Sequence, residues 1–425
     1  MEFGAASVQI VGDDSMIIAG GILPAYYTGQ EGELRASCMI IKQESHLICL
    51  VVCDVIMIKK IYIDQMCDRI KQSVGIERKN ILITATHTHH APSTIEVHGY
   101  KPDSRFMVRL QDAVVEAVTE AFSHVVKVLA YMINLQVDSI GQNSRLLLDD
   151  KQILWVPQNE EMRKYPTTGP YDPDMPVVVF KDSATDCLKG ILFNHSCHNI
   201  GNIENKRSPG FYGLAAQELE KEMHCPVIFT PGASGSTHDF SKDPANLLLN
   251  IKHAIQKAIP LAIRQESTQV ATLLEEFDYH IRYFDEQKEE QAVTQYCTSQ
   301  DISDCGSAED VIGVFRSMRK VLSVKKGDKK SSCIQAVRIG DIAFLALPGE
   351  VFTSLGLAIK EQSPFTYTYI IELSNDSIGY IPDEQAFDLG GYQVWTGFHS
   401  VIEKGLGETL VNKSVMLLHT LFESV

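Results

Sequence analysis

The sequence predicts an α/β fold in which a mixed sheet forms the core and helices flank it. Short apolar runs of strand length alternate with amphipathic helical patterns through the first two thirds of the 425-residue chain. Hydrophobic residues make up 44% of the chain and charged residues 22%, which is enough apolar material for a large core. No internal repeat, low-complexity segment or linker interrupts the pattern. We therefore expect one composite domain over residues 1–425.

Apolar runs bounded by polar or glycine-rich turns predict the strands. The longest run, residues 47–58, is interrupted by Asp54 and is shorter than the roughly 20 residues needed to cross a bilayer, so it indicates a buried strand and its continuation. The expected strands are residues 39–41, 47–56, 81–84, 127–137, 175–180, 190–194, 226–230, 273–283, 336–346 and 366–373.

Apolar residues spaced three and four positions apart predict helices between these strands. One of them follows a clear turn signal, Ser208-Pro209-Gly210. The expected helices are residues 62–74, 105–121, 212–223, 246–264, 351–360 and 407–422. The polar stretch 286–332 includes a run of lysines, and we expect it to be a solvated surface insertion.

Charge and cysteine usage restrict the function. A net charge of -16 and a pI near 5.3 argue against a nucleic-acid partner, which would need a basic face. The start, Met1 to Ala5, lacks the basic and apolar regions of a secretory signal, and no transmembrane segment is expected. The 10 cysteines are scattered without a CxxC pair, as is typical of reduced thiols. A cytoplasmic location is therefore expected.

Three histidines follow the expected strand 81–84, where a buried segment opens into a loop. On an extended segment His87 and His89 point to the same side and His90 points away. Imidazole is a common metal ligand, so one of these rings is a candidate ligand while its neighbour faces a substrate. The alternative is a solvated turn that is rich in histidine.

A second polar cluster follows the expected strand 190–194. His195 and His198 cannot both face inward on an ideal strand, so we expect one of them to be a ligand and the other a neighbour. A nucleophilic role for Cys197 is less favoured, because adjacent residues of a strand point to opposite faces.

Three further segments place polar groups after apolar strands, where open α/β sheets put their sites. The glycines of segment 232–239 allow close backbone approach and N–H donation to an oxyanion, although a plain tight turn is the favoured interpretation of this segment alone. Glu350 follows a strand and opens a helix, as a ligand or as a capping acid. Two glycines precede Tyr392 and leave room around its phenol.

Taken together, these segments resemble the catalytic domain of the neutral, non-lysosomal ceramidase family, including its short bacterial members. The resemblance extends over nearly the whole chain. It is carried by residues 85–89 (ATHTH), residues 348–353 (PGEVFT) and the segment from Asn375-Asp376 through Gly379-Tyr380 to Gly390-Gly391-Tyr392. In that family one zinc ion is held by two histidines, a glutamate and a tyrosine.

The resemblance implies a zinc site and neighbouring catalytic residues in this chain. The implied Zn²⁺ ligands are His87, His198, Glu350 and Tyr392, with His195 as the alternative to His198. His89 would face the substrate, and Arg145 resembles the family's arginine near the scissile group.

The chain also departs from the family pattern. His238 and Ser236 stand where the lipid-cleaving members have the serine and the aspartate of Gly-Asp-Val-Ser-Pro, and Asn199 replaces a proline. The chain ends at Val425, so we expect no C-terminal immunoglobulin-like domain. These departures argue against a long-chain ceramide substrate without affecting the implied metal ligands.

The expected function is therefore zinc-dependent hydrolysis of an amide, or less favourably an ester, in a small-molecule or lipid substrate. His89 or His238 would give a proton to the leaving amine. Asp54, at the end of its strand, is a candidate partner for a ligand histidine or simply a strand-terminating residue. The alternatives are a hydrolase of small polar N-acyl or sugar-derived compounds and a non-catalytic ligand-binding relative. The sequence makes no prediction of the oligomeric state.

Overall fold

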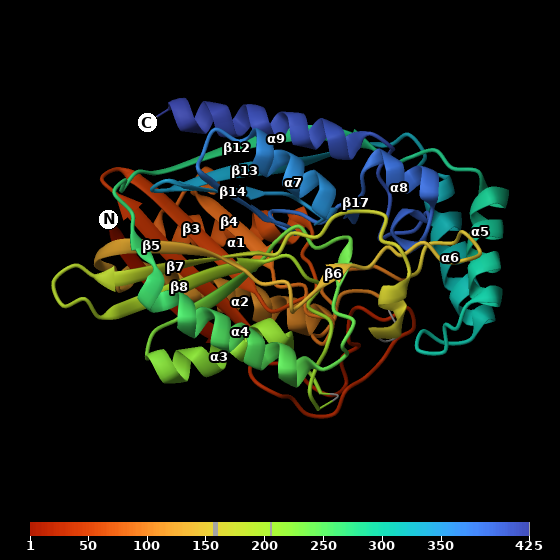
Figure 1. Cartoon of the computed structure of the whole chain (residues 1–425), viewed down its shortest axis with the longest axis horizontal. Helices are drawn as coiled ribbons and strands as arrows, with labels where there is room; N and C mark the ends of the chain where they lie inside the picture. The colour runs from red at the N-terminus through yellow and green to blue at the C-terminus, as the bar shows by residue number, and fades with distance from the viewer. Residues whose placement is uncertain (156–159, 205, 425) are drawn as a thin grey trace.

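Two β-sheets pack face to face, and helices cover their outer faces (Figure 1). The computed structural model describes residues 1–155, 160–204 and 206–424. The expected α/β class, with a mixed sheet flanked by helices, is confirmed.

The larger sheet has an antiparallel centre and parallel pairs toward its two edges. Strands β3 and β4 are parallel, as are β8 and β9, whereas the pairs between them are antiparallel. Its order is β4 (Ile81–Ala85), β3 (His46–Cys53), β2 (Arg35–Gln43), β1 (Glu2–Gln9), β5 (Val126–Gln136), β7 (Asp174–Asp182), β8 (Leu188–His195) and β9 (Val227–Pro231), with β11 (Ile263–Arg264) paired to β5.

The edge strands of this sheet, β4 and β9, nevertheless approach each other. The sheet therefore curls, in keeping with the twist that strands impose. Residues that follow opposite edges are thereby brought to one place.

The smaller sheet packs on the concave side of this arrangement. Its order is β12 (Val270–His280), β13 (Lys329–Ile339), β14 (Ile342–Ala346) and β16 (Tyr367–Ile371), with only β14 and β16 parallel. Apolar side chains from both sheets form one cluster between them, including Phe180, Leu192, Phe344 and Tyr369.

Helices cover the remaining faces, as their one-sided apolar patterns predict. In α2, for example, Phe106, Leu110 and Val114 are buried at a spacing of four. The larger sheet carries α1 (Lys60–Val74), α2 (Ser104–Ser123), α3 (Gly210–Met223) and α4 (Pro244–Ala258). The smaller sheet carries α7 (Thr353–Gln362) and α9 (Leu406–Glu423), of which α9 lies above the sheet in Figure 1.

The remaining elements lie toward one end of the sheets. Helices α5 (Glu286–Ser299) and α6 (Ala308–Ser323) pack on each other, and α8 (Glu384–Leu389) lies near them (Figure 1). Two small strand pairs complete the fold: β6 (Gln142–Asn143) with β10 (Thr237–His238), and β15 (Glu350–Val351) with β17 (Tyr380–Ile381).

Several expected elements differ in the structure. Residues 336–346 form parts of two strands, because Gly340 adopts a left-handed turn between β13 and β14. The helix expected to reach residue 264 ends at Ala258, just before Pro260. Strand β1 was not expected, although it joins the two halves of the larger sheet.

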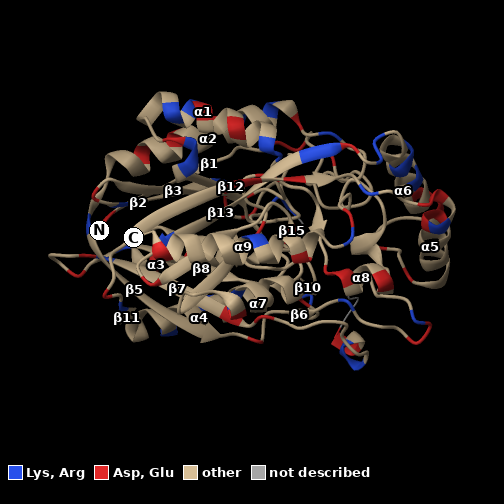
Figure 2. Ribbon diagram, turned by 90° about the horizontal axis from the view of Figure 1, so that it is seen from above, with Lys and Arg blue, Asp and Glu red and all other residues tan. Residues whose placement is uncertain are grey.

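The region expected to be a surface insertion contains both α5 and α6. Its outer faces are polar, and Figure 2 shows acidic and basic residues interspersed on these helices. Phe315 of α6, however, is fully buried, and its ring lies against those of Trp155 and Tyr392. Part of this region is therefore core. Within the described ranges, no helix has both the length and the apolar character to cross a membrane.

Truncating a side chain between the two sheets should destabilise the protein strongly. Phe344→Ala removes a ring that is only 2% exposed and should lower the free energy of unfolding by about 3–5 kcal/mol. Val324→Ala, at a side chain that is 83% exposed, is the control and should change it by less than about 0.5 kcal/mol. Urea titration of the two variants measures both values, and equal losses would contradict the sheet-on-sheet packing.

Candidate functional site

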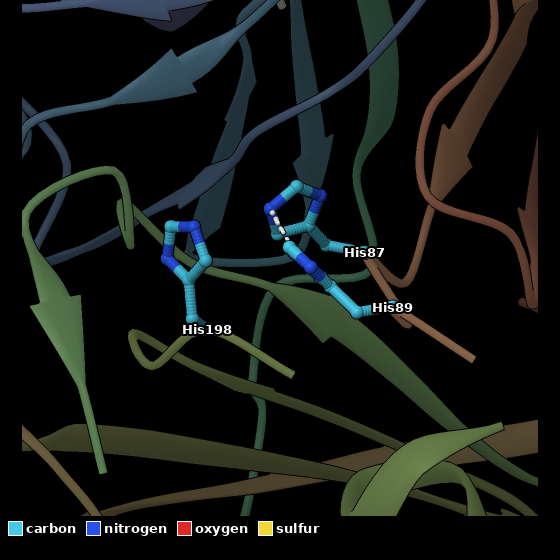
Figure 3. A group of neighbouring side chains, drawn as sticks. All are labelled: His87, His89 and His198. Atoms are coloured by element: carbon cyan, nitrogen blue, oxygen red, sulfur yellow. Dashed lines mark hydrogen bonds between the residues drawn. The ribbon is translucent and has the colours of Figure 1, made fainter. Parts of the chain in front are cut away.

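Two histidines and a glutamate converge on one point between the edges of the larger sheet. The Nε2 atoms of His87 and His198 each lie 3.3 Å from Oε2 of Glu350. All three side chains are buried, with at most 3% of each side chain exposed. Figure 3 shows the rings of His87, His89 and His198 facing a common space.

These side chains come from distant segments that the fold brings together. His87 follows β4, His198 follows β8, and Glu350 begins β15. The backbone of His87 has a φ of 60°, in the left-handed region that non-glycine residues rarely adopt. The chain therefore turns at His87 instead of continuing as a strand, and such strain is common at functional sites.

Backbone carbonyl groups fix the orientation of both imidazoles. Nδ1 of His87 donates to the Ile56 carbonyl at 2.9 Å, and Nδ1 of His198 donates to the Ser234 carbonyl at 2.7 Å. Because a carbonyl can only accept, each Nδ1 carries the proton and each Nε2 keeps a lone pair. Metal-binding histidines use this arrangement to hold their rings in place.

The spacing of the donor atoms suits a tetrahedral metal ion. Ligand atoms on a tetrahedral zinc are about 3.3 Å apart, because the bonds are about 2.0–2.1 Å long. Nε2 of His89 lies 3.2 Å from Nε2 of His87, which matches the 3.3 Å separations to Glu350. The nitrogens of His87, His89 and His198 all lie within 4.8 Å of one another. The nitrogens of His87 and His198 and the Glu350 oxygen fit zinc, and the His89 ring lies beside them.

The electrostatics of the cluster are those of a buried acid among imidazoles. Burial acts to raise the pKa of Glu350, but His87 and His198 outweigh it and hold that pKa well below its ordinary value. Burial acts to lower the pKa of His87, but the Glu350 carboxylate outweighs it and the pKa is raised. For His198 burial prevails and the pKa is lowered.

His89 and His238 flank the cluster without direct contact with Glu350. His89 is the only partly exposed member of the three-histidine group. A Cβ on Gly20 would lie 2.5 Å from its Nδ1, so only glycine permits this close approach. The ring of His238 stacks on that of His198, with centroids 4.2 Å apart. Burial, followed by the neighbouring histidines, lowers the pKa of both His89 and His238 well below the ordinary value.

Two tyrosines lie near the cluster, and they differ in their partners. The hydroxyl of Tyr380 is 3.4 Å from Nε2 of His198 and hydrogen bonds to Glu350. The hydroxyl of Tyr392 instead lies 3.0 Å from Nε2 of His98, and the centroids of the two tyrosine rings are 5.8 Å apart. Burial, with the charge of Glu350, raises the pKa of both phenols well above the ordinary value.

The surroundings hold Tyr392 in a fixed plane. Trp155 stacks on one face at 4.6 Å, and the ring of His399 lies parallel to it at 4.6 Å. Nδ1 of His98 faces the Gly21 carbonyl at 2.9 Å and is therefore the protonated nitrogen, so the Tyr392 hydroxyl donates to Nε2.

Arg145 contacts the segment that carries Tyr392. Its guanidinium donates to the Gly390 carbonyl and to Oε1 of Gln393, each at 2.7 Å. Burial lowers its pKa to about 10, so it remains a cation at neutral pH.

Comparison with solved structures finds proteins with a similar fold. Neutral ceramidase from Pseudomonas aeruginosa matches with a TM-score of 0.77 and 15% sequence identity, over 100% of this chain and 75% of that one. A structure described as ceramidase complexed with C2 matches with a TM-score of 0.78 and 14% identity over the same shares. This chain has the ceramidase fold. Neither a protein-family model nor a curated protein sequence matches it.

Within this ceramidase fold, the structure separates the candidates that the sequence left open. His198 reaches Glu350, whereas His195 bonds through Nδ1 to the hydroxyl of Tyr212 and lies away from the cluster. His90 points elsewhere, and its Nε2 accepts from the Gly201 N–H. The thiol of Cys197 is buried, and burial raises its pKa well above the ordinary value, which disfavours a thiolate nucleophile.

For two segments the sequence left a functional and a plain structural interpretation open, and the structure favours the structural one. Asp54 is not the partner of a ligand histidine, because it accepts from the Arg35 N–H while Ile56 and Ser234 hold the imidazoles. In segment 232–239, three N–H groups beside or at the glycines are already used and are not available to an oxyanion. Those of Gly232 and Gly235 donate to backbone carbonyls, and that of Ser234 donates to Glu372.

Sequence analysis missed Tyr380, His98 and Glu372. Tyr380 lay within the segment that carried the family resemblance, so its position could have marked it as a second candidate phenol. His98 and Glu372 carry no local pattern that distinguishes them from loop or strand-end residues.

Substitution of a clustered histidine should remove a bound metal. His87→Ala or His198→Ala deletes a nitrogen from the shared site, so each purified variant should contain zinc at well below one equivalent per chain by elemental analysis. His90→Ala is the matched control, because His90 is also buried but outside the cluster. Full zinc occupancy in either of the first two variants would contradict the site.

Proposed function

We propose that this protein is a zinc-dependent hydrolase that cleaves an amide bond in a small-molecule or lipid substrate. The observation that carries the proposal is the convergence of His87, His198 and Glu350 at tetrahedral spacing. The likeness to the ceramidase fold supports amide hydrolysis as the reaction class.

The proposed zinc ligands are His87, His198, Glu350 and one phenol. Contact with both His198 and Glu350 favours Tyr380 as this phenol over Tyr392, the ligand expected from the sequence. When bound, zinc lowers the pKa of a coordinated water toward neutrality and polarises the substrate carbonyl.

The residues around these ligands would transfer protons and position the substrate. His89 and His238 are neutral at pH 7 because their pKa values are lowered, so either ring can accept a proton from the attacking water. The same ring then returns a proton to the leaving amine. Arg145, which is tied to the Tyr392 segment, would position the substrate near the scissile group.

A small polar N-acyl or sugar-derived substrate is the second candidate. A pocket of about 390 Å³ lies beside the Tyr392 segment, and its lining includes Gly391 and Trp395. Its lining mixes apolar side chains such as Val394 with charged ones such as Lys151 and Lys288. The charged groups favour a polar substrate over a long alkyl chain, because burying apolar surface beside ionised groups strips them of water.

Hydrolysis of a short substrate panel tests the function. The zinc-loaded protein should release amine from at least one of an N-acyl sphingosine, an N-acyl amino acid and an N-acyl amino sugar. Removing zinc with a chelator, or the change Glu350→Ala, should bring the rate to background. A protein that binds zinc tightly but hydrolyses no amide or ester would instead be a ligand-binding relative.

The two phenols can be distinguished by their effect on zinc affinity. Tyr380→Phe should weaken zinc binding by more than about 10-fold, since it removes a donor at the site. Tyr392→Phe should leave zinc affinity unchanged and lower turnover. Chelator competition measures the affinity, and the reverse result would support the ligand set expected from the sequence.

A further inference from the structure

Glu372 joins the two edges of the larger sheet through its backbone. It directly follows β16 and is fully buried. Its N–H donates to the Pro231 carbonyl at the end of β9, at 3.1 Å. Its carbonyl accepts from the hydroxyl of Thr84 in β4, at 2.8 Å. The segments that lead to His87 and to Ser234 are thus tied to one residue.

The side-chain carboxyl group of Glu372, whose pKa is raised to about 8 by burial, continues this connection into the metal site. It accepts from the N–H of Ser234 at 3.1 Å, from the hydroxyl of Ser234, and from the N–H of Val351 at 2.8 Å. The Ser234 carbonyl is the acceptor that orients His198, and Val351 directly follows Glu350. Each of these contacts therefore involves a residue that either hydrogen bonds to a candidate metal ligand or adjoins one in the chain.

The hydrogen bonds account for a buried acid that lacks a cationic partner. Among the described residues, no lysine or arginine forms an ion pair with Glu372. Burying an acid without donors is strongly unfavourable, so the donors from Ser234 and Val351 are what make the position tolerable. If this position served only to fill space, an apolar side chain of the same size would be more favourable there.

We propose that Glu372 is a positioning residue that assembles the metal site. It fixes His198 through Ser234 and Glu350 through Val351, and its backbone fixes the approach of β4, which leads to His87. It contacts no ligand atom itself. The inference rests on the proposed zinc site and names the residue that preorganises that site.

The test compares two substitutions at Glu372 with a matched control. Glu372→Met keeps the length but removes both acceptors, whereas Glu372→Gln keeps one oxygen that can accept from Ser234 and Val351. Glu289→Met is the control, because Glu289 accepts from the N–H and the hydroxyl of Thr396 in the same way, in the α5 region. Chelator competition gives the zinc dissociation constant of each variant, and the visible spectrum of the Co²⁺-loaded protein reports the ligand geometry.

Glu372→Met should weaken zinc binding about 10- to 100-fold and alter the Co²⁺ spectrum, as expected for loss of a group that orients ligands. Glu372→Gln should recover most of the affinity. Glu289→Met should lower thermal stability but leave zinc affinity and the spectrum unchanged. If Glu372→Met does not fold, Ser234→Ala removes only the hydroxyl contact and should give a smaller change in the same direction.

Wild-type affinity and an unaltered spectrum in the foldable Glu372 and Ser234 variants would overturn the inference. Equal weakening by Glu289→Met would also overturn it, because the effect would then be general destabilisation. These outcomes are distinct from failure of the proposed function. A wild-type protein that binds zinc but hydrolyses no substrate would refute the hydrolase and leave Glu372 as the organiser of a binding site, whereas one that binds no zinc would refute both.

Discussion

The approach of strands β4 and β9 is the constraint on which the site depends. These strands are the two edges of one sheet, and the segments beyond β4 and β8 carry His87 and His198. In a flat sheet of this width the two imidazoles would lie far apart, because neighbouring strands are about 4.8 Å apart. Curvature of the sheet therefore brings the two histidines together, which no local sequence motif could do. The smaller sheet packs on the curved face and stabilises this curvature.

Within that frame, main-chain groups set the direction of the side chains. The carbonyl groups of Ile56 and Ser234 hold the imidazoles of His87 and His198. The orientation of each ring therefore depends on the backbone of a loop, and the strands set the position of that loop. The buried acid Glu350 lies between the two rings. Backbone contacts of this kind orient metal ligands, which is what a site with defined geometry requires.

Local patterns predicted most strands and helices, because apolar periodicity follows from the burial of one face. They also located the segments of His87, His198 and Glu350, since polar residues after apolar strands are visible in the sequence. Side-chain partners that depend on contacts between distant segments were not predictable from the sequence. His87 and His89 do face each other, but through a left-handed turn and not through strand alternation. The contacts of Tyr380 and Glu372 exist only once distant segments meet.

The aromatic packing around Tyr392 gives the protein a built-in optical reporter. The chain has only two tryptophans, and both lie against this tyrosine: Trp155 at 4.6 Å and Trp395 at 6.3 Å between ring centroids. Indole emission responds to the polarity and order of its surroundings, and no tryptophan elsewhere dilutes the signal. Intrinsic fluorescence of the unlabelled protein will therefore follow events beside the histidine cluster, including ligand entry.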